Sequence, residues 1–414
     1  MALKIRNILF CCVCCCILST TIICKFAVMA GGSFPEWFQF NTNRSLLEGR
    51  LLNDFPTINA HKVLNGQFQD EFESYVSELP PMRDSLLLVD SASQRAAISA
   101  AASFFGYDVY PTYFDSDFVY NETNDTIYPR PKAEDAILTD QLLKASVAIN
   151  ELVASRSSHN YYFALVPKNQ PLAFKPLSDL NSSTIDYTYS NFLDSLDADI
   201  RKVDLSVSSL EDYNNKYFRT DHHWNIDGGY DAYAKIANEM GFGSELIKKG
   251  EALVYDEIKF YGYSSRHGKD IDIASDVIRD YIFDLPQLDV WFDHEKVDYS
   301  SLADINKYQS GEAPKEITAD HYGEYFHNDY SEIRIEAKNT DNERNLLIIG
   351  DSYTNCIERL FTEHYGKVHV YDPRYSSINI YEFIDKYNGE YDDILFLSSE
   401  LVYKDGNTLA NLSK

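Results

Sequence analysis

The chain has 414 residues and a formal net charge of −27, from 64 acidic and 37 basic side chains. Nucleic-acid binding depends on Lys and Arg side chains that neutralise phosphates, so this charge argues against nucleic acid as a partner. The length exceeds what one hydrophobic core usually organises, so we expect one large α/β domain with substantial insertions, or two domains. We interpret the 31 Tyr and 24 Phe mainly as core packing, although exposed rings could stack on sugars.

Residues 1–30 have the pattern of a signal peptide or membrane anchor. Lys4 and Arg6 precede an uncharged run over 7–24, which is marginal for a membrane span and long for the core of a signal peptide. The basic residues on the N-terminal side favour an uncleaved, single-pass anchor with the body outside the cytoplasm. The alternative is secretion after cleavage near Ala30.

Cysteine is distributed unevenly along the chain. Six of the seven Cys lie within residues 11–24, and the rest of the chain holds only Cys356. The exported body therefore has no pair for an intrachain disulfide, which is more typical of a bacterial cell envelope than of a eukaryotic secreted protein. We expect Cys356 to be buried rather than reactive.

The first half of the body alternates helix and strand patterns. A lead-in over 31–84, which we expect to pack on the body, contains helical spacing at Phe68, Phe72 and Tyr75. The elements predicted after it are a buried strand over 86–89, a helix over 134–154, a buried strand over 161–166 and a helix from Asn225 or Asp227 to Gly241. A helix followed by a fully apolar strand is typical of a parallel sheet covered on both faces.

The C-terminal third repeats this alternation more clearly. Strands are predicted over 346–349, 368–371 and 394–397, and helices over 354–364 and 378–387. This βαβαβ order forms a parallel sheet with right-handed crossovers.

Residues 243–340 lack the alternation and hold β-like pieces over 258–261, 290–292 and 333–337. We therefore expect a β-rich insertion over 243–340, which divides the main domain into a first part over 85–242 and a second part over 341–414.

A Gly-Asp-Ser segment lies where a predicted buried strand meets a helix. Ser352 follows Gly350 and Asp351 at the carboxyl end of that strand, the edge at which parallel sheets bind ligands. The N–H groups at the start of a helix can hold the oxyanion of an acyl-transfer intermediate. The alternative is that Asp351 or Ser352 only caps the helix.

An Asp-x-His segment lies about 130 residues earlier. In an extended segment Asp221 and His223 would point to the same face, so the carboxylate would orient this imidazole as a base for a serine, and Trp224 would wall the site. One alternative is a metal site formed by these two residues with His222 and Asp227. Another is a pair of histidines that only pack. We expect neither a metal nor a cofactor at this site.

Arg374 follows another predicted strand and could face the same sheet edge. There it would hold an anionic or hydroxylated substrate, or it would form a structural ion pair with Asp372.

The tetrad Asp221-His222-His223-Trp224 and the Gly-Asp-Ser segment together resemble the DHHW family. That family is similar to SGNH-hydrolase-like proteins that O-acetylate alginate and related polysaccharides. The resemblance covers most of the body, at residues 47–50, 56, 66–83, 166–168, 260–262, 349–353 and 369–375.

The resemblance implies an SGNH-like parallel sheet flanked by helices. It implies Ser352 as nucleophile, His223 as general base and Asp221 as the orienting carboxylate. The substrate would be a cell-surface polysaccharide, O-acetylated or deacetylated through an acetyl-serine intermediate, with a membrane acyltransferase as a partner that supplies acetyl groups.

Two segments depart from the family pattern. Phe260-Tyr261-Gly262-Tyr263-Ser264 interrupts a Gly-Ser pair seen in relatives. Where SGNH enzymes often carry an oxyanion-hole asparagine, this chain has Leu397-Ser398-Ser399-Glu400. The alternative function is therefore a non-catalytic glycan-binding or cell-envelope assembly protein on a decayed SGNH frame.

Overall fold

The computed structural model describes residues 125–129, 136–166, 191–267 and 274–414, apart from 208, 316–318, 339–340 and 404–405. Earlier in the chain it describes 19–20, 23–24, 27, 32, 44–45, 50–59, 62–63, 66–105 except 79 and 81, and 118–121. The chain divides into two compact units, residues 1–124 with 265–273 and residues 125–264 with 274–414. Most of the predicted signal or anchor lies outside the described residues. Within the described part, no helix has both the length and the apolar character needed to cross a bilayer.

In the part that the structure describes, the first unit contains helices and short strands. Strands β1 (Arg44–Ser45) and β2 (Arg50–Leu51) pair antiparallel, and β3 spans Phe118–Asn121. Helix α3 (Gln67–Ser77) confirms the helical spacing predicted in the lead-in.

The strand predicted over 86–89 is wrong, because these residues lie inside helix α4 (Arg83–Phe105). The apolar run is only four residues long, and the alanine-rich sequence that follows it favours a helix. Leu86 and Val89 are 52% and 66% exposed, so the run does not form a core strand.

The second unit is built on one eight-stranded sheet in the order β10-β9-β11-β13-β12-β14-β5-β6. Strands β13, β12, β14, β5 and β6 run parallel, whereas β9, β10 and β11 pair antiparallel at one edge. This confirms the predicted α/β class with a mostly parallel sheet. The strands are β5 (Asn160–Leu165), β6 (Ile200–Lys202), β9 (Leu288–Phe292), β10 (Glu295–Val297), β11 (Glu332–Ala337), β12 (Asn345–Gly350), β13 (Lys367–Tyr371) and β14 (Asp393–Ser398).

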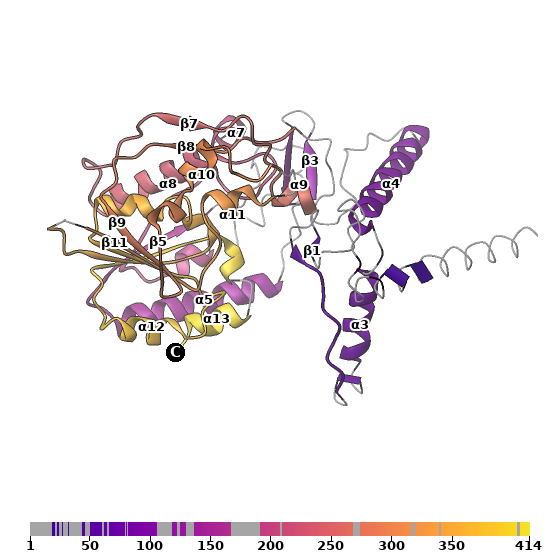
Figure 1. Cartoon of the computed structure of the whole chain (residues 1–414). Coiled ribbons are helices and arrows are strands. Elements are labelled where there is room, and N and C mark those ends of the chain that lie inside the picture. The colour runs from indigo at the N-terminus through magenta and orange to yellow at the C-terminus, as the bar shows by residue number, and fades with distance from the viewer. Residues whose placement is uncertain are drawn as a thin grey trace, which may run out of the picture. The chain divides into compact units, whose positions relative to one another are not determined.

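Helices cover both faces of this sheet (Figure 1). Helices α5 (Ala136–Ser155), α12 (Ile380–Lys386) and α13 (Gly406–Leu412) lie on one face, and α8 (Ile226–Glu239) lies on the other. Along β12, Leu346 and Ile348 pack into the core beneath α8, while Leu347 and Ile349 pack into the core beneath α5. Successive side chains of a strand point to opposite faces, so a fully apolar strand serves two cores.

The described residues also contain smaller elements. Strands β9, β10 and β11 come from the stretch 243–340, which therefore contributes three strands to the main sheet. From the same stretch, β7 (Ala252–Val254) pairs antiparallel with β8 (Arg279–Tyr281) in a separate two-stranded sheet. The remaining elements are β4 (Thr126–Pro129), α7 (Leu210–Lys216), α9 (Tyr263–His267), α10 (Ile305–Gln309), α11 (His321–Tyr325) and the 3-10 helices η2 (Tyr299–Leu302) and η5 (Glu400–Tyr403).

The prediction of an α-helix over 354–364 is also wrong. Two 3-10 helices, η3 (Ser352–Thr354) and η4 (Glu358–Glu363), occupy this stretch. The Thr354 hydroxyl donates to Asp351 O at 3.0 Å, and the Asn355 amide donates to His327 O at 3.3 Å. The Thr354 bond is a local side-chain bond to the backbone, the kind that competes with regular helical hydrogen bonds.

Candidate active site

Ser352 lies immediately after β12, at the carboxyl end of the parallel strands. Gly350 ends that strand, and a Cβ there would lie 2.7 Å from Leu397 O and 2.5 Å from Thr354 Cγ2. Only glycine fits this close approach between β12 and β14. The tight packing fixes the backbone that carries the Ser352 hydroxyl.

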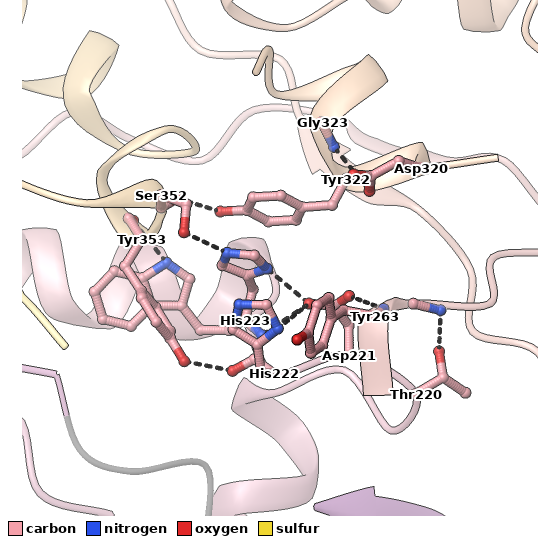
Figure 2. Close-up of polar contacts among 12 residues, drawn as sticks. Thr220, Asp221, His222, His223, Tyr263, Asp320, Tyr322, Gly323, Ser352 and Tyr353 are labelled. Carbon is pink, nitrogen blue, oxygen red and sulfur yellow. Dashed lines mark hydrogen bonds and ion pairs between the residues drawn. The ribbon is translucent and has the colours of Figure 1, made fainter. Parts of the chain in front are cut away.

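A chain of two hydrogen bonds joins Ser352, His223 and Asp221 (Figure 2). Ser352 Oγ lies 2.8 Å from His223 Nε2, and His223 Nδ1 lies 2.6 Å from Asp221 Oδ1. An ionised carboxylate only accepts, so Nδ1–H donates to Asp221 and Nε2 accepts from the Ser352 hydroxyl. This is the arrangement in which an imidazole can withdraw the serine proton.

Asp221 is buried and receives several donors. Its Oδ1 accepts from the backbone N–H of His223 at 2.9 Å, and its Oδ2 accepts from the backbone N–H of Tyr263 at 2.5 Å. Burial would raise the pKa of Asp221, but the neighbouring His222 and His223 rings and the His223 hydrogen bonds outweigh it, and the pKa lies below its ordinary value. The carboxylate therefore stays ionised beside the imidazole.

The backbone of this segment differs from the extended form predicted for it. Residues 219–223 form a bend, in which the backbone N–H of His223 returns to the Asp221 carboxylate two residues earlier. This Asx turn, not strand alternation, brings the Asp221 and His223 side chains together. The rings of His222 and His223 consequently do not diverge, and their centroids lie 3.9 Å apart.

The structure brings together only three of the four residues considered as metal ligands. Ligand atoms of Asp221, His222 and His223 lie within 4.8 Å of one another. However, Asp227 lies in a different network, where its Oδ1 accepts from Lys249 Nζ at 2.5 Å and from Tyr281 OH at 2.8 Å. Both ring nitrogens of His223 are already engaged. Hydrogen bonding within a Ser-His-Asp group therefore fits these residues better than ligation does.

His222 packs beside the catalytic candidates without joining their hydrogen bonds. Its Nδ1 is buried, lies 3.6 Å from Asp221 Oδ1 and has no hydrogen-bond partner among the described residues. Burial and the adjacent His223 ring lower the pKa of His222, so its imidazole is neutral.

Aromatic side chains wall the site. Tyr322 stacks face to face on His223 with ring centroids 3.9 Å apart and an interplanar angle of 4°. Tyr353 OH donates to His222 O at 2.5 Å, and the buried Trp224 donates from Nε1 to Tyr353 O at 3.1 Å. Trp224 is therefore buried behind Tyr353 and does not itself line the site.

Two other candidates are held in structural contacts. The Asp351 carboxylate accepts from Tyr353 N at 3.2 Å, from Ser399 N at 2.9 Å and from Ser399 Oγ at 2.7 Å, so it caps η3 and joins the ends of β12 and β14. Arg374 forms ion pairs with Asp372 at 2.6 Å and with Asp329 at 3.0 Å.

Two residues that contact the catalytic candidates were not predicted as site residues. Tyr322 is one of 31 Tyr and belongs to α11, within the stretch predicted as an insertion. Gly262 lies against Asp221, and a Cβ there would come within 2.3 Å of Asp221 Cβ.

The fold and the site define an α/β protein with a Ser-His-Asp group at the carboxyl edge of a parallel sheet. No protein-family model and no curated protein sequence matches the chain. Among solved structures, Bacillus cereus PatB1 with a sulfonyl adduct is similar at a TM-score of 0.57 and 21% identity, over 73% of this chain and 100% of that one.

A DHHW family protein from Eubacterium siraeum is similar at a TM-score of 0.51 and 20% identity, over 72% of this chain and 96% of that one. The O-acetyltransferase domain of Pseudomonas putida AlgJ matches at a TM-score of 0.41 and 12% identity, over 72% and 98%. The resemblance to the DHHW family noted in the sequence is therefore confirmed among solved structures, at the level of the fold.

Proposed function

We propose that the chain is an exported, serine-dependent acyl-transfer enzyme that adds an acetyl group to a cell-surface polysaccharide or removes one from it. The observation that carries the proposal is the hydrogen-bond chain from Ser352 through His223 to Asp221, with distances of 2.8 and 2.6 Å. A nucleophile, its base and the group that orients the base are what acyl transfer requires.

The first half-reaction forms an acetyl-serine. Ser352 Oγ bonds to the acetyl carbonyl carbon while its proton passes to His223 Nε2, and ionised Asp221 stabilises the imidazolium. The bond between the carbonyl carbon and the donor oxygen then breaks, and Nε2 returns the proton to that oxygen.

The second half-reaction releases the acetyl group. A sugar hydroxyl or water attacks the acetyl carbon of the intermediate, and its proton passes to His223 Nε2. The bond to Ser352 Oγ breaks, and the proton returns to that oxygen. A sugar acceptor makes the reaction a transfer, and water makes it a hydrolysis.

We assign the Ser352 backbone N–H as an oxyanion donor, since it lies beside the nucleophile at the end of β12. The 3-10 helix η3 is only three residues long, so a helix dipole adds little here. Individual hydrogen bonds, rather than a helix dipole, would then stabilise the negative charge that develops on the acyl oxygen.

Exposed tyrosines support a glycan as the substrate. Tyr263 is 41% exposed, and its ring centroid lies 5.1 Å from that of His222. Tyr375, which follows Arg374, is 56% exposed. The exposed face of Tyr263 beside the proposed reaction site suits the apolar face of a sugar ring.

The remaining parts of the proposal rest on the sequence. The pattern of residues 1–30 supports export, with the body held outside the cytoplasm by an uncleaved anchor or secreted after cleavage. A transferase outside the cytoplasm needs a supply of acetyl groups, for which we propose a membrane acyltransferase partner.

A sulfonyl fluoride tests the nucleophile without a known sugar substrate. Purified protein is incubated with phenylmethylsulfonyl fluoride, which sulfonylates an activated serine and releases fluoride, and the adduct is located by peptide mass spectrometry. We expect one adduct on Ser352, none in Ser352→Ala, and a rate roughly a hundred-fold lower in His223→Ala. Ser310→Ala, which removes an exposed serine on another loop, is the matched control.

Hydrolysis of p-nitrophenyl acetate by the same variants then tests acyl transfer itself. Equal rates for the wild type, Ser352→Ala and His223→Ala would contradict the catalytic proposal. That result, together with binding to an immobilised glycan, would favour the non-catalytic alternative.

A further inference from the structure

We propose that Tyr322 is a positioning residue that holds the His223 ring and the Ser352 backbone in the geometry needed for acyl transfer. The inference deepens the proposed function and rests on it. Tyr322 contacts both partners of the proton transfer, because its ring stacks on His223 and its hydroxyl bonds to Ser352 (Figure 2).

The stack restricts the imidazole. The two ring planes are 4° from parallel with centroids 3.9 Å apart, so the Tyr322 ring covers one face of His223. Rotation of the imidazole out of this plane would carry Nε2 off the line to Ser352 Oγ and Nδ1 off the line to Asp221. A packed ring on one face therefore keeps both hydrogen bonds aligned.

The stack also favours the charged intermediate of the reaction. When His223 accepts the serine proton it becomes a cation, and a cation over the face of an aromatic ring is attracted by the ring quadrupole. This attraction is stronger after proton transfer than before it, so it lowers the barrier and does more than bind the ground state.

The hydroxyl of Tyr322 fixes the other partner. It donates to the Ser352 carbonyl at 3.0 Å, and burial raises its pKa well above the ordinary value, so it remains a neutral donor. The same carbonyl also accepts from Asn355 N at 3.3 Å. Because this second donor remains, we expect the loss of the hydroxyl to matter less than the loss of the ring.

Tyr322 is itself held rigidly on α11. The Asp320 side chain caps the helix, and the side chain of Tyr322 is almost fully buried. One turn along the helix, Tyr325 donates to Asp280 Oδ2 at 2.8 Å. Phe218 packs edge-on against the Tyr322 ring, with centroids 6.3 Å apart. These contacts therefore hold the Tyr322 ring in one position beside His223.

The test measures sulfonylation of Ser352 at a series of phenylmethylsulfonyl fluoride concentrations, which separates the maximal rate constant from the half-saturating concentration. The variants are Tyr322→Phe, which keeps the ring, and Tyr322→Leu and Tyr322→Met, which remove it. Tyr325→Phe is the matched control, because it loses a buried hydroxyl on the same helix without touching His223 or Ser352. Melting temperatures and the folded fraction are measured for every variant.

We expect the maximal rate constant per folded molecule to fall roughly ten-fold in Tyr322→Leu and Tyr322→Met, with the half-saturating concentration unchanged. We expect Tyr322→Phe to stay close to wild type, and Tyr325→Phe to change only the melting temperature. Wild-type rates in both ring-less variants, or a Tyr322→Phe as slow as they are, would overturn the inference.

The methionine variant fills the space with a flexible chain, so it remains informative if the leucine variant does not fold. If the proposed function itself is wrong, the wild type forms no adduct on Ser352. This outcome differs from failure of the Tyr322 inference, in which the wild type still reacts.

Discussion

Gly262 lies directly against the carboxylate of Asp221. A Cβ at position 262 would come within 2.3 Å of Asp221 Cβ and 2.4 Å of Asp221 Oδ2. The loop before α9 thus approaches the orienting carboxylate so closely that only glycine fits. The Tyr263 N–H that follows it donates to the same carboxylate.

The first prediction concerns this contact. We expect Gly262→Ala to push Asp221 away from His223, to cost about 1–3 kcal/mol in unfolding free energy and to slow sulfonylation of Ser352. Urea unfolding and the sulfonylation rate per folded molecule measure the two effects. Gly366→Ala is the control, since a Cβ there would lie 2.0 Å from Asn342 O, away from the site. A normal rate in Gly262→Ala would contradict the role of the contact.

The second prediction concerns Asp221 and pH. Its pKa in the folded protein lies below the ordinary value of 3.8, so its charge stabilises the fold above that pH, and this contribution is lost as the pH falls below it. The unfolding free energy of wild type should therefore exceed that of Asp221→Asn by more at pH 6 than at pH 3. Urea titrations at both values measure the difference, and a gap that widens toward pH 3 would refute this assignment.

The third prediction concerns glycan binding. Tyr263→Ala should raise the KM for an oligosaccharide acceptor or an acetylated oligosaccharide, because it removes an exposed ring beside His222, while sulfonylation of Ser352 keeps its wild-type rate. Tyr299→Ala removes a ring that is 48% exposed on η2 and serves as the control. Equal KM values in the two variants would remove Tyr263 from the glycan site.

The fourth prediction concerns metal. Because both ring nitrogens of His223 are engaged, treatment with a chelator should leave the sulfonylation rate unchanged. His222→Ala should also remain reactive, since His222 makes no hydrogen bond to Ser352 in the described structure. Zinc bound at one equivalent by wild type, and lost in His222→Ala, would instead support the metal alternative.

The fifth prediction concerns Cys356. Burial raises the pKa of this thiol to about 12, and its side chain has no exposed surface. Iodoacetamide at pH 8 should therefore leave Cys356 unmodified in the folded protein and alkylate it in urea. Peptide mass spectrometry reads the modification at this cysteine. Rapid alkylation under native conditions would show that the core around η4 opens.

The sequence predicted the elements that a local pattern determines. Strands β12 and β14 follow from short apolar runs, because a strand buried on both faces has no polar side. Strand β13 follows from a similar run that includes the buried His369. Helix α8 begins where Asn225 caps it, with Asn225 Oδ1 accepting from the N–H groups of Asp227 and Gly228. The predicted group Ser352, His223 and Asp221 is brought together in the structure.

The features that were missed depend on contacts between distant segments. Tyr322 is 30 residues from Ser352 along the chain, and no periodicity marks a tyrosine whose ring covers a histidine. The 3-10 helices η3 and η4 occupy the stretch predicted as an α-helix, where Asn355 bonds to His327 O and Trp224 bonds to Cys356. Local propensity cannot anticipate such tertiary contacts.

The strand order places a constraint on when the site can form. Strand β12, which carries Ser352, pairs with β13 and β14, and both follow it in the sequence. Among the described strands, β14 lies between β12 and β5 in the sheet. A chain emerging from a ribosome or a translocation channel therefore exposes Asp221 and His223 long before Ser352 has a sheet to anchor it. We therefore expect Ser352 to reach its position beside His223 only after β14 has paired with β12.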